Sequence, residues 1–393
     1  MEKVNKRILA LDILRGISVA GMALVNHPGS WKAVYAPLLH ARWNGLTPTD
    51  LIFPFFIFIM GISMYISLRK YHFECTGPVL LKVVKRTFVI FFIGLALSWF
   101  GNFCSYWAKP AGDIGLGMRL WNSIWTFDHL RIPGVMQRLA LCYGIGTILT
   151  LNIKHQRIPY LAFSLLAGYF IVLWSGNGFA YDKSNICSIV DHAVLTSAHL
   201  QNDRGIDPAG ILGTIPSVAN VLLGFWVGQL LFGSGKPAAS RSEQLDRYLI
   251  RLFLVGSVLA FSGLLLSYGC PINKKIWSPT FVLATCGFAA TSLALLIWII
   301  DVKGCKRWSR FFEVFGINPL FMYVLGSMLG KVLQVIPVVW YGESYSLRSF
   351  LYKECLSPVF GDYGASFAYA LIFVVINWII GYQLYKRKIY IKI

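Results

Sequence analysis

The chain has 393 residues, of which 56% are hydrophobic, and its 36 Lys and Arg residues outnumber 17 Asp and Glu residues to give a net charge of +19. A mean hydropathy of +0.61 excludes an ordinary soluble protein, because a soluble chain of this size could not cover so much apolar surface. The charge does not indicate nucleic-acid binding, since its distribution follows the pattern of membrane topology.

Apolar runs of roughly 18 or more residues, separated by charged or Gly- and Pro-containing segments, recur along the chain and predict membrane helices. We therefore expect an all-α polytopic membrane protein in which residues 1–393 form a single transmembrane domain. About ten spans are predicted, near residues 8–27, 46–68, 84–101, 132–151, 158–175, 209–232, 249–268, 278–300, 311–336 and 366–385.

The first predicted span resembles a secretory signal peptide, because Lys3, Lys6 and Arg7 precede an apolar run. However, Asp12 and Arg15 interrupt that run, and no cleavage site of the small-x-small type follows it. We interpret the segment as a retained first helix.

Lys and Arg residues predict the orientation of the helices. If the N-terminus is cytoplasmic, the cytoplasmic segments hold 22 of these residues and the outer segments hold 11. This bias is the positive-inside pattern, so both termini are expected in the cytoplasm. The larger outer loops, near residues 28–45, 102–131, 176–208 and 337–365, are rich in aromatic and hydrogen-bonding side chains that suit either sugar rings or an interfacial aromatic belt.

Polar and ionisable side chains within the predicted spans are functional candidates, because placing them in a bilayer is costly. Asp12 and Arg15 are three residues apart on one helix face and can pair. Each such residue could instead form a structural ion pair or extend to the membrane surface. The residues that together predict a polar cavity through the bundle are Asp12, Arg15, Gln137, Arg138, Asn220, Asn318, Tyr323, Lys331 and Gln334.

His40 lies where an outer loop enters the second predicted span. Thr47 is a candidate N-cap with Pro48 at the first helical position and Asp50 three residues on, as in a capping box. A histidine there can accept a proton from an amine nucleophile or carry an acyl group. Asn26, at the outer end of the first span, could donate to a developing oxyanion or simply cap its helix.

Four of the eight cysteines, namely Cys104, Cys187, Cys270 and Cys355, fall outside the membrane on this topology. Four cysteines allow three pairings, and an oxidising compartment would permit disulfides, but free buried thiols fit the sequence equally well. The chain contains no CxxC motif, which argues against zinc and thiol-redox chemistry.

Seven segments resemble the signature of the heparan-alpha-glucosaminide N-acetyltransferase family, and the resemblance extends from about residue 7 to 385. The second and third include Val25-Asn26-His27-Pro28-Gly29 and His40-Ala41-Arg42-Trp43-Asn44-Gly45. Taken together the motifs are specific, whereas any one alone would be weak. The segments are residues 11–16, 25–29, 39–54, 131–138, 207–210, 273–279 and 316–320.

The resemblance implies a multi-pass enzyme that transfers acetyl from cytoplasmic acetyl-CoA to the amino group of a glucosamine-type sugar on the outer side. It implies that His40 is catalytic, as general base or acetyl carrier, with Asn26 as its partner. CoA carries phosphates, so Arg15 and Arg138 are expected to bind it, with Gln137 and Asn318 as polar partners. A thioester is already activated, so no metal is expected.

The chain looks like one of the compact bacterial relatives of this family, which predicts an integral protein of the bacterial inner membrane. The partners expected are acetyl-CoA, an amino-sugar acceptor and the lipid bilayer, and a homodimer is compatible with a compact membrane enzyme. An amino-sugar or N-acetyl-sugar permease is the alternative, motivated by the polar cavity and the aromatic outer loops.

Overall fold

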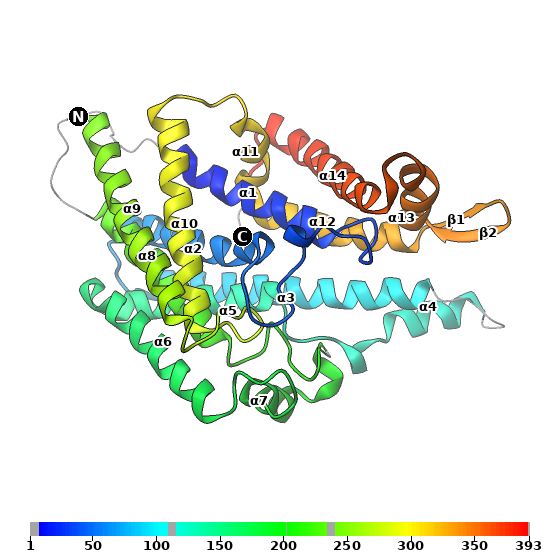
Figure 1. Cartoon of the computed structure of the whole chain (residues 1–393), viewed down its shortest axis with the longest axis horizontal. Helices are drawn as coiled ribbons and strands as arrows, with labels where there is room; N and C mark the ends of the chain where they lie inside the picture. Colours follow the sequence, from blue (N-terminus) through cyan, green and yellow to red (C-terminus); the bar gives the residue numbers. More distant parts are fainter. Residues whose placement is uncertain (1–7, 109–114, 202, 234–239, 392–393) are drawn as a thin grey trace.

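The computed structural model describes residues 8–108, 115–201, 203–233 and 240–391. It confirms an all-α fold, with one two-stranded hairpin as its sheet among these residues (Figure 1). The helices are α1 (Leu9–Asn26), α2 (Pro48–Leu68), α3 (Gly77–Trp107), α4 (Leu116–Ile124), α5 (Val135–Asn152), α6 (Ile158–Ser175), α7 (Ile186–Leu195), α8 (Thr214–Phe232), α9 (Arg241–Leu266), α10 (Pro279–Leu296), α11 (Ser309–Ile317), α12 (Pro319–Val335), α13 (Leu347–Phe350) and α14 (Ser357–Lys386).

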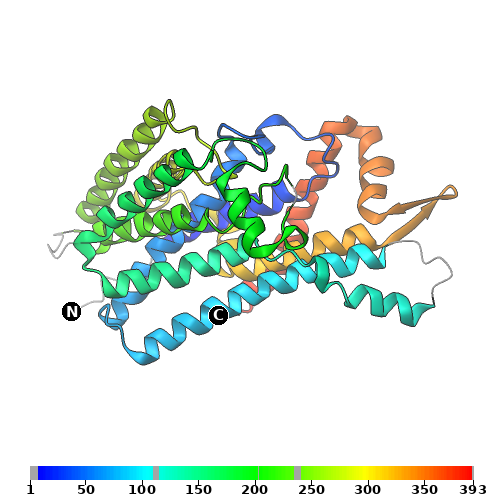
Figure 2. The ribbon, with the colours of Figure 1, turned by 90° about the horizontal axis from the view of Figure 1, so that it is seen from below.

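All ten predicted spans fall on helices. Among the described residues, seven helices are long and apolar enough to cross a membrane, or eight if the bent pair α11 and α12 forms one span. The helices α3 and α5 are not among them, although α3 runs for 31 residues along most of the molecule (Figure 2). The multi-pass membrane fold is therefore supported, and the number of ten crossings stays a prediction.

The span predicted near residues 311–336 is not a single straight helix. The structure has two helices there, α11 and α12, which meet at 89° around Asn318. Asn318 has φ −120° and ψ 57°, outside the helical region. The cause is Pro319, because its ring disfavours a helical conformation in the preceding residue and it has no N–H to continue the helical hydrogen bonds.

The last predicted span begins earlier than residue 366, and the outer loop expected before it is mostly structured. Strand β1 (Pro337–Trp340) pairs antiparallel with β2 (Glu343–Ser346), with Pro337 opposite Ser346. Helix α14 then starts at Ser357 and is interrupted at Gly361, whose φ of 66° favours glycine. The apolar run of residues 366–385 identified only the part of α14 beyond this interruption.

Glycines allow two pairs of helices to approach backbone to backbone. A Cβ atom on Gly16 of α1 would lie 1.9 Å from the Phe312 carbonyl oxygen of α11. A Cβ on Gly61 of α2 would lie 2.2 Å from the Val221 carbonyl oxygen of α8. Small residues serve this purpose in membrane bundles, where close backbone packing replaces the hydrophobic effect between helices. The first contact holds α1 against α11, and the second holds α2 against α8, where Val221 belongs to the main hydrophobic core.

The beginning and the end of the described chain lie at the same end of the bundle. Near the C-terminus, the Asn318 amide donates to the Ile389 carbonyl at 2.9 Å and accepts from the Ile391 N–H at 2.9 Å. Near the start of α1, a Cβ on Gly316, two residues before Asn318, would meet the Asp12 carbonyl. At the opposite end, the Gly29 N–H donates to the Ser366 carbonyl. Helices α1 and α14 therefore run antiparallel, which supports termini on one side; that this side is the cytoplasm stays a prediction.

Candidate functional site

His40, Asp50 and Lys274 form a compact cluster at the start of α2. The His40 Nδ1 atom lies 2.7 Å from Asp50 Oδ1, and the Lys274 Nζ atom lies 2.9 Å from His40 Nδ1 and 3.3 Å from the same Asp50 oxygen. Asp50 is fully buried, whereas the side chain of His40 is 46% exposed. A carboxylate bound at Nδ1 favours the tautomer with a proton on that nitrogen, which leaves Nε2 free to accept another.

Asp50 fixes the loop in front of α2 with its second oxygen. Asp50 Oδ2 accepts from the Thr47 N–H and the Ala41 N–H, both at 3.1 Å, and from the Thr47 hydroxyl at 2.9 Å. These contacts confirm the predicted cap of α2 by Thr47 and Asp50. One carboxylate therefore both folds the loop that carries His40 and orients the His40 ring.

Lys274 comes from the loop between α9 and α10, which docks against the His40 loop. The Gly45 N–H donates to the Ile272 carbonyl at 2.8 Å, and the Asn273 amide donates to Asn44 Oδ1 at 3.1 Å. Asn273 also accepts from the N–H groups of the two residues after Lys274 through its own Oδ1. These contacts fix the turn that directs Lys274 at Asp50.

A second set of contacts attaches the His40 loop and the α9–α10 loop to residues 176–208. The Trp43 ring stacks on Tyr181 with centroids 4.5 Å apart, and its indole N–H donates to the Phe179 carbonyl. The ammonium of Lys275 lies 4.5 Å from the Tyr181 ring centroid and 2.6 Å from Asp203 Oδ2. The aromatic side chains here pack on one another, so they hold the loop in place.

The electrostatic environment of Lys274 differs from that of an ordinary surface lysine. Its side chain is 20% exposed. Burial lowers the pKa of the Lys274 ammonium to about 8, although the nearby Asp50 carboxylate acts in the opposite direction. Asp50 therefore faces two basic groups, His40 and Lys274.

Asn26, the predicted partner of His40, ends α1 with an exposed side chain. Within the part of the chain that the structure describes, no hydrogen bond joins it to His40. Lys274 approaches His40 instead. This lysine lies within one of the family motifs, residues 273–279, and no role was predicted for it. A lysine 234 positions away gives no local signal of this contact.

Arg15 and Asp12 form the predicted ion pair, with Arg15 Nη1 3.2 Å from Asp12 Oδ1. The guanidinium also donates to the Ser63 hydroxyl at 2.7 Å and to the Gly316 carbonyl at 3.5 Å. These contacts link α1 to α2 and α11 beside the glycine crossing. Arg15 is thus bound to three elements of the protein itself.

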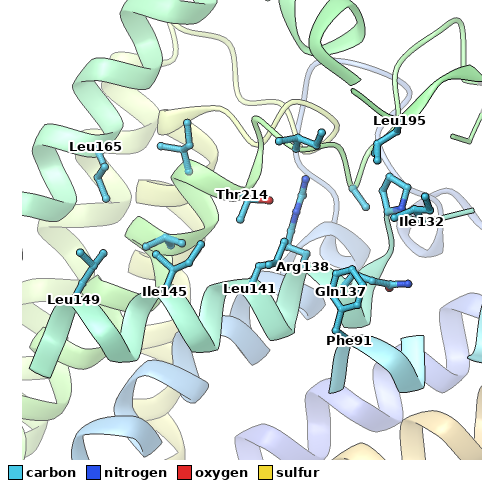
Figure 3. Close-up of a pocket in the computed structure, with 15 residues that line it drawn as sticks. Phe91, Ile132, Gln137, Arg138, Leu141, Ile145, Leu149, Leu165, Leu195 and Thr214 are labelled. Carbon is cyan, nitrogen blue, oxygen red and sulfur yellow. The ribbon is translucent and has the colours of Figure 1, made fainter. Parts of the chain in front are cut away.

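Gln137 and Arg138 lie at one end of a cavity of about 470 Å³ between α5, α6 and α8 (Figure 3). Its walls are mostly aliphatic, and Figure 3 shows Leu141 and Ile145 below the guanidinium of Arg138. Arg138 donates to the carbonyl oxygens of Pro208 and Gly210 at 2.9 and 2.8 Å. Among the described residues, Arg138 Nε and Gln137 Nε2 have no hydrogen-bond partner.

Arg131 holds the loop that receives Arg138. It forms two hydrogen bonds to the carboxylate of Asp207, at 3.0 and 2.7 Å. The same carboxylate accepts from the N–H groups of Gln201 and Ala209, so it organises the turn before Gly210. The positions of Pro208 and Gly210 opposite Arg138 follow from this arrangement.

Two further predicted residues, Asn318 and Lys331, lie next to α12 and on it. The Asn318 side chain holds the C-terminal segment, as described above. Lys331 lies against α3, where a Cβ on Gly101 would be 3.4 Å from its Cε atom. In the described ranges, neither residue has a hydrogen bond or ion pair with the His40 cluster.

The cysteines are not joined in disulfides in the structure. All eight cysteines are free thiols, including Cys104, Cys187, Cys270 and Cys355. In the part of the chain that the structure describes, there is no group of His, Cys, Asp and Glu that could hold a metal ion.

The comparison with known proteins assigns the chain to a family. The sequence model described as heparan-alpha-glucosaminide N-acetyltransferase, catalytic, matches residues 7–263. The chain belongs to the heparan-alpha-glucosaminide N-acetyltransferase family. The matched range contains His40, Asp50 and Asn26, whereas Lys274 and Asn318 lie beyond it.

Two curated heparan-alpha-glucosaminide N-acetyltransferases resemble the chain. It is 26% identical to the one from Mus musculus over 444 residues, which cover 98% of this chain and 60% of the relative. It is 28% identical to the one from Homo sapiens over 375 residues, which cover 81% of this chain and 52% of the relative. The chain thus spans between half and two thirds of the length of these relatives.

Proposed function

We propose that the chain is a transmembrane N-acetyltransferase that moves acetyl from acetyl-CoA to the amino group of a glucosamine-type sugar. The observation that carries the proposal is the His40–Asp50 pair, which places a proton on Nδ1 and leaves Nε2 of His40 without one in a chain of this family. Acetyl-CoA enters from the cytoplasm of a bacterial cell, and the acceptor binds on the outer side of the inner membrane.

The geometry of His40 suits the chemistry of acyl transfer. In a direct reaction, the acceptor amine attacks the thioester carbonyl, Nε2 takes the amine proton, and the tetrahedral intermediate expels the CoA thiolate, which then receives the proton. In a two-step reaction, Nε2 first attacks the thioester carbonyl and expels the CoA thiolate, and the amine then displaces Nε2 from the acetyl group while its proton passes to the thiolate. Both routes need Nε2 unprotonated and Nδ1 held by Asp50.

The remaining assignments of the site are part of the same proposal. Gln137 and Arg138 bind acetyl-CoA; their support is the pair of unpartnered N–H donors beside the 470 Å³ cavity. Support for Arg15 and Asn318 as CoA ligands is weaker, because their side chains are bound to the protein. Asn26 donates to the oxyanion, which requires its exposed side chain to approach the acetyl group once substrate is present.

The test is transfer of labelled acetyl from acetyl-CoA to glucosamine by membranes that contain the protein. We expect activity in the unaltered protein and in the control His129→Ala, an exposed histidine of another outer loop, and no activity in His40→Ala. Full activity of His40→Ala would overturn the assigned role.

Uptake of labelled sugar into sealed vesicles without acetyl-CoA would instead favour the permease. Labelled acetyl on His40 without acceptor identifies the two-step route.

A further inference from the structure

The side chain of the preceding residue and the backbone of Lys274 make the contacts that hold Lys274 at the His40 cluster. The buried Asn273 before it binds Asn44 of the His40 loop, and the Trp277 N–H donates to the Lys274 carbonyl at 3.1 Å. The Lys274 Nζ atom is 2.9 Å from His40 Nδ1 and 3.5 Å from His40 Nε2. An ammonium is therefore fixed beside both ring nitrogens.

Asp50 has only one oxygen for the two neighbouring basic groups. Its Oδ2 is occupied by the Thr47 and Ala41 donors, so His40 and Lys274 share Oδ1. When Nδ1 of His40 carries its proton towards Asp50, that nitrogen offers the ammonium of Lys274 no acceptor, and Oδ1 of Asp50 at 3.3 Å lies closer to the ammonium than Nε2 of His40 at 3.5 Å. The single negative charge of Asp50 is then shared by two basic groups, His40 and Lys274.

We propose that Lys274 is a positioning residue that keeps His40 unprotonated, by sharing the Asp50 carboxylate and opposing a second positive charge on the imidazole. This inference rests on the proposed function, because it explains how His40 remains a base at neutral pH. A carboxylate alone would stabilise the imidazolium and make His40 harder to deprotonate. The adjacent ammonium offsets that effect while Asp50 still orients the ring.

Asp50 and Lys274 are the charged groups that contact His40 among the described residues, and the other charged groups nearby lie around Tyr181. His40 faces Asp50 from α2 and Lys274 from the loop before α10. Lys275, Asp203 and Arg204 gather around the Tyr181 ring, where Lys275 pairs with Asp203. With a pKa of about 8, Lys274 is itself still mostly charged at neutral pH.

The first test follows acetyl transfer as a function of pH in Lys274→Met, with Lys274→Arg as the charge-retaining variant and Lys32→Met as a control on an exposed outer lysine. The same acceptor is used throughout, so its own ionisation is common to all profiles. We expect the acidic limb of kcat/KM in Lys274→Met to move up by about one to two pH units, since removing a charge at this distance shifts a pKa by that amount. Lys274→Arg should restore most of the original profile, and Lys32→Met should not change it.

The second test does not depend on activity. The titration of His40 is followed by NMR in detergent-solubilised protein labelled at the histidine ring carbons, with His40→Ala to assign the signal. A rise of the His40 midpoint in Lys274→Met, but not in Lys274→Arg, supports the proposal; an unchanged or lower midpoint overturns it, even if activity falls. If the unaltered protein transfers no acetyl, the proposed function fails, and the NMR titration still decides the role of Lys274.

Discussion

The carboxylate of Asp50 binds the His40 imidazole at 2.7 Å through Oδ1 and caps α2 through Oδ2. The group that folds the loop is therefore the same group that orients the candidate base. Substitutions at this site are expected to change catalysis and stability together, and the predictions below separate the two effects.

Asp50→Asn should nearly abolish acetyl transfer. The asparagine amide would donate to Nδ1 of His40 and favour the opposite tautomer, in which Nε2 carries the proton and cannot act as a base. We expect a loss of about 10³-fold or more in kcat, as when the carboxylate of a catalytic triad is replaced by an amide. Unfolding should become easier by about 1 kcal/mol because the cap is weakened. Asp182→Asn, an exposed residue of another outer loop, is the control.

Lys274 should react with amine-specific reagents at a lower pH than other lysines. Its lowered pKa of about 8 means that the reactive neutral amine becomes the major form once the pH rises above that value. Competitive labelling followed by peptide mass spectrometry should give half-maximal intrinsic reactivity near pH 8. In Asp50→Asn the midpoint should fall further, because the carboxylate that stabilises the ammonium is lost. Labelling of Lys274 only at the pH of an unperturbed lysine would contradict the burial seen here.

Arg138→Lys should weaken acetyl-CoA binding and also destabilise the protein. A lysine cannot reach both the Pro208 and Gly210 carbonyls, so we expect a loss of about 2 kcal/mol in stability from the broken contacts. If Arg138 also binds CoA, KM for acetyl-CoA should rise about tenfold, equivalent to about 1.4 kcal/mol. Arg131→Lys is the matched control, because Arg131 holds the same loop through Asp207. Equal KM values in the two variants would leave Arg138 a structural role only.

Gly316→Ala should disrupt the crossing of α1 and α11. The new Cβ atom would lie 2.1 Å from the Asp12 carbonyl oxygen, so the helices must separate and the neighbouring Arg15 contacts must weaken. We expect a loss of about 3 kcal/mol, at the upper end of the usual cost of overpacking, seen as a lower midpoint of thermal unfolding in detergent. Gly168→Ala on α6 is the control, because a Cβ there meets nothing within 4 Å. Equal midpoints for the two variants would show that the α1–α11 contact is not close.

Local sequence patterns predicted those parts of the site that depend on neighbouring residues. The apolar runs located the helices, and the spacing of Thr47, Pro48 and Asp50 predicted the cap of α2, because both features act within a few residues. The role of His40 followed from its position and from the family motifs, and it stays a proposal. The polar residues within the spans were found because charge in an apolar run is conspicuous.

Features that depend on distant contacts could not be predicted in the same way. Nothing near Lys274 in the sequence indicates that the α9–α10 loop docks on residues 40–47. The partners of Arg15 and Arg138 include backbone carbonyls, which every residue carries and which therefore give no sequence signal. The bend at Asn318 was signalled by Pro319, but the apolar residues on both sides favoured one continuous span.

The separation of His40 and Lys274 by 234 positions also sets an order of assembly during synthesis. A nascent chain that has inserted α1 to α8 already contains His40 and Asp50, but the lysine that shares their carboxylate has not yet been made. Until the α9–α10 hairpin docks, Asp50 would pair with the imidazole alone, without the ammonium that shares its Oδ1. The three-residue cluster would then be complete only when the bundle is nearly complete, so on the proposal made above the full basicity balance at His40 would be set late in synthesis.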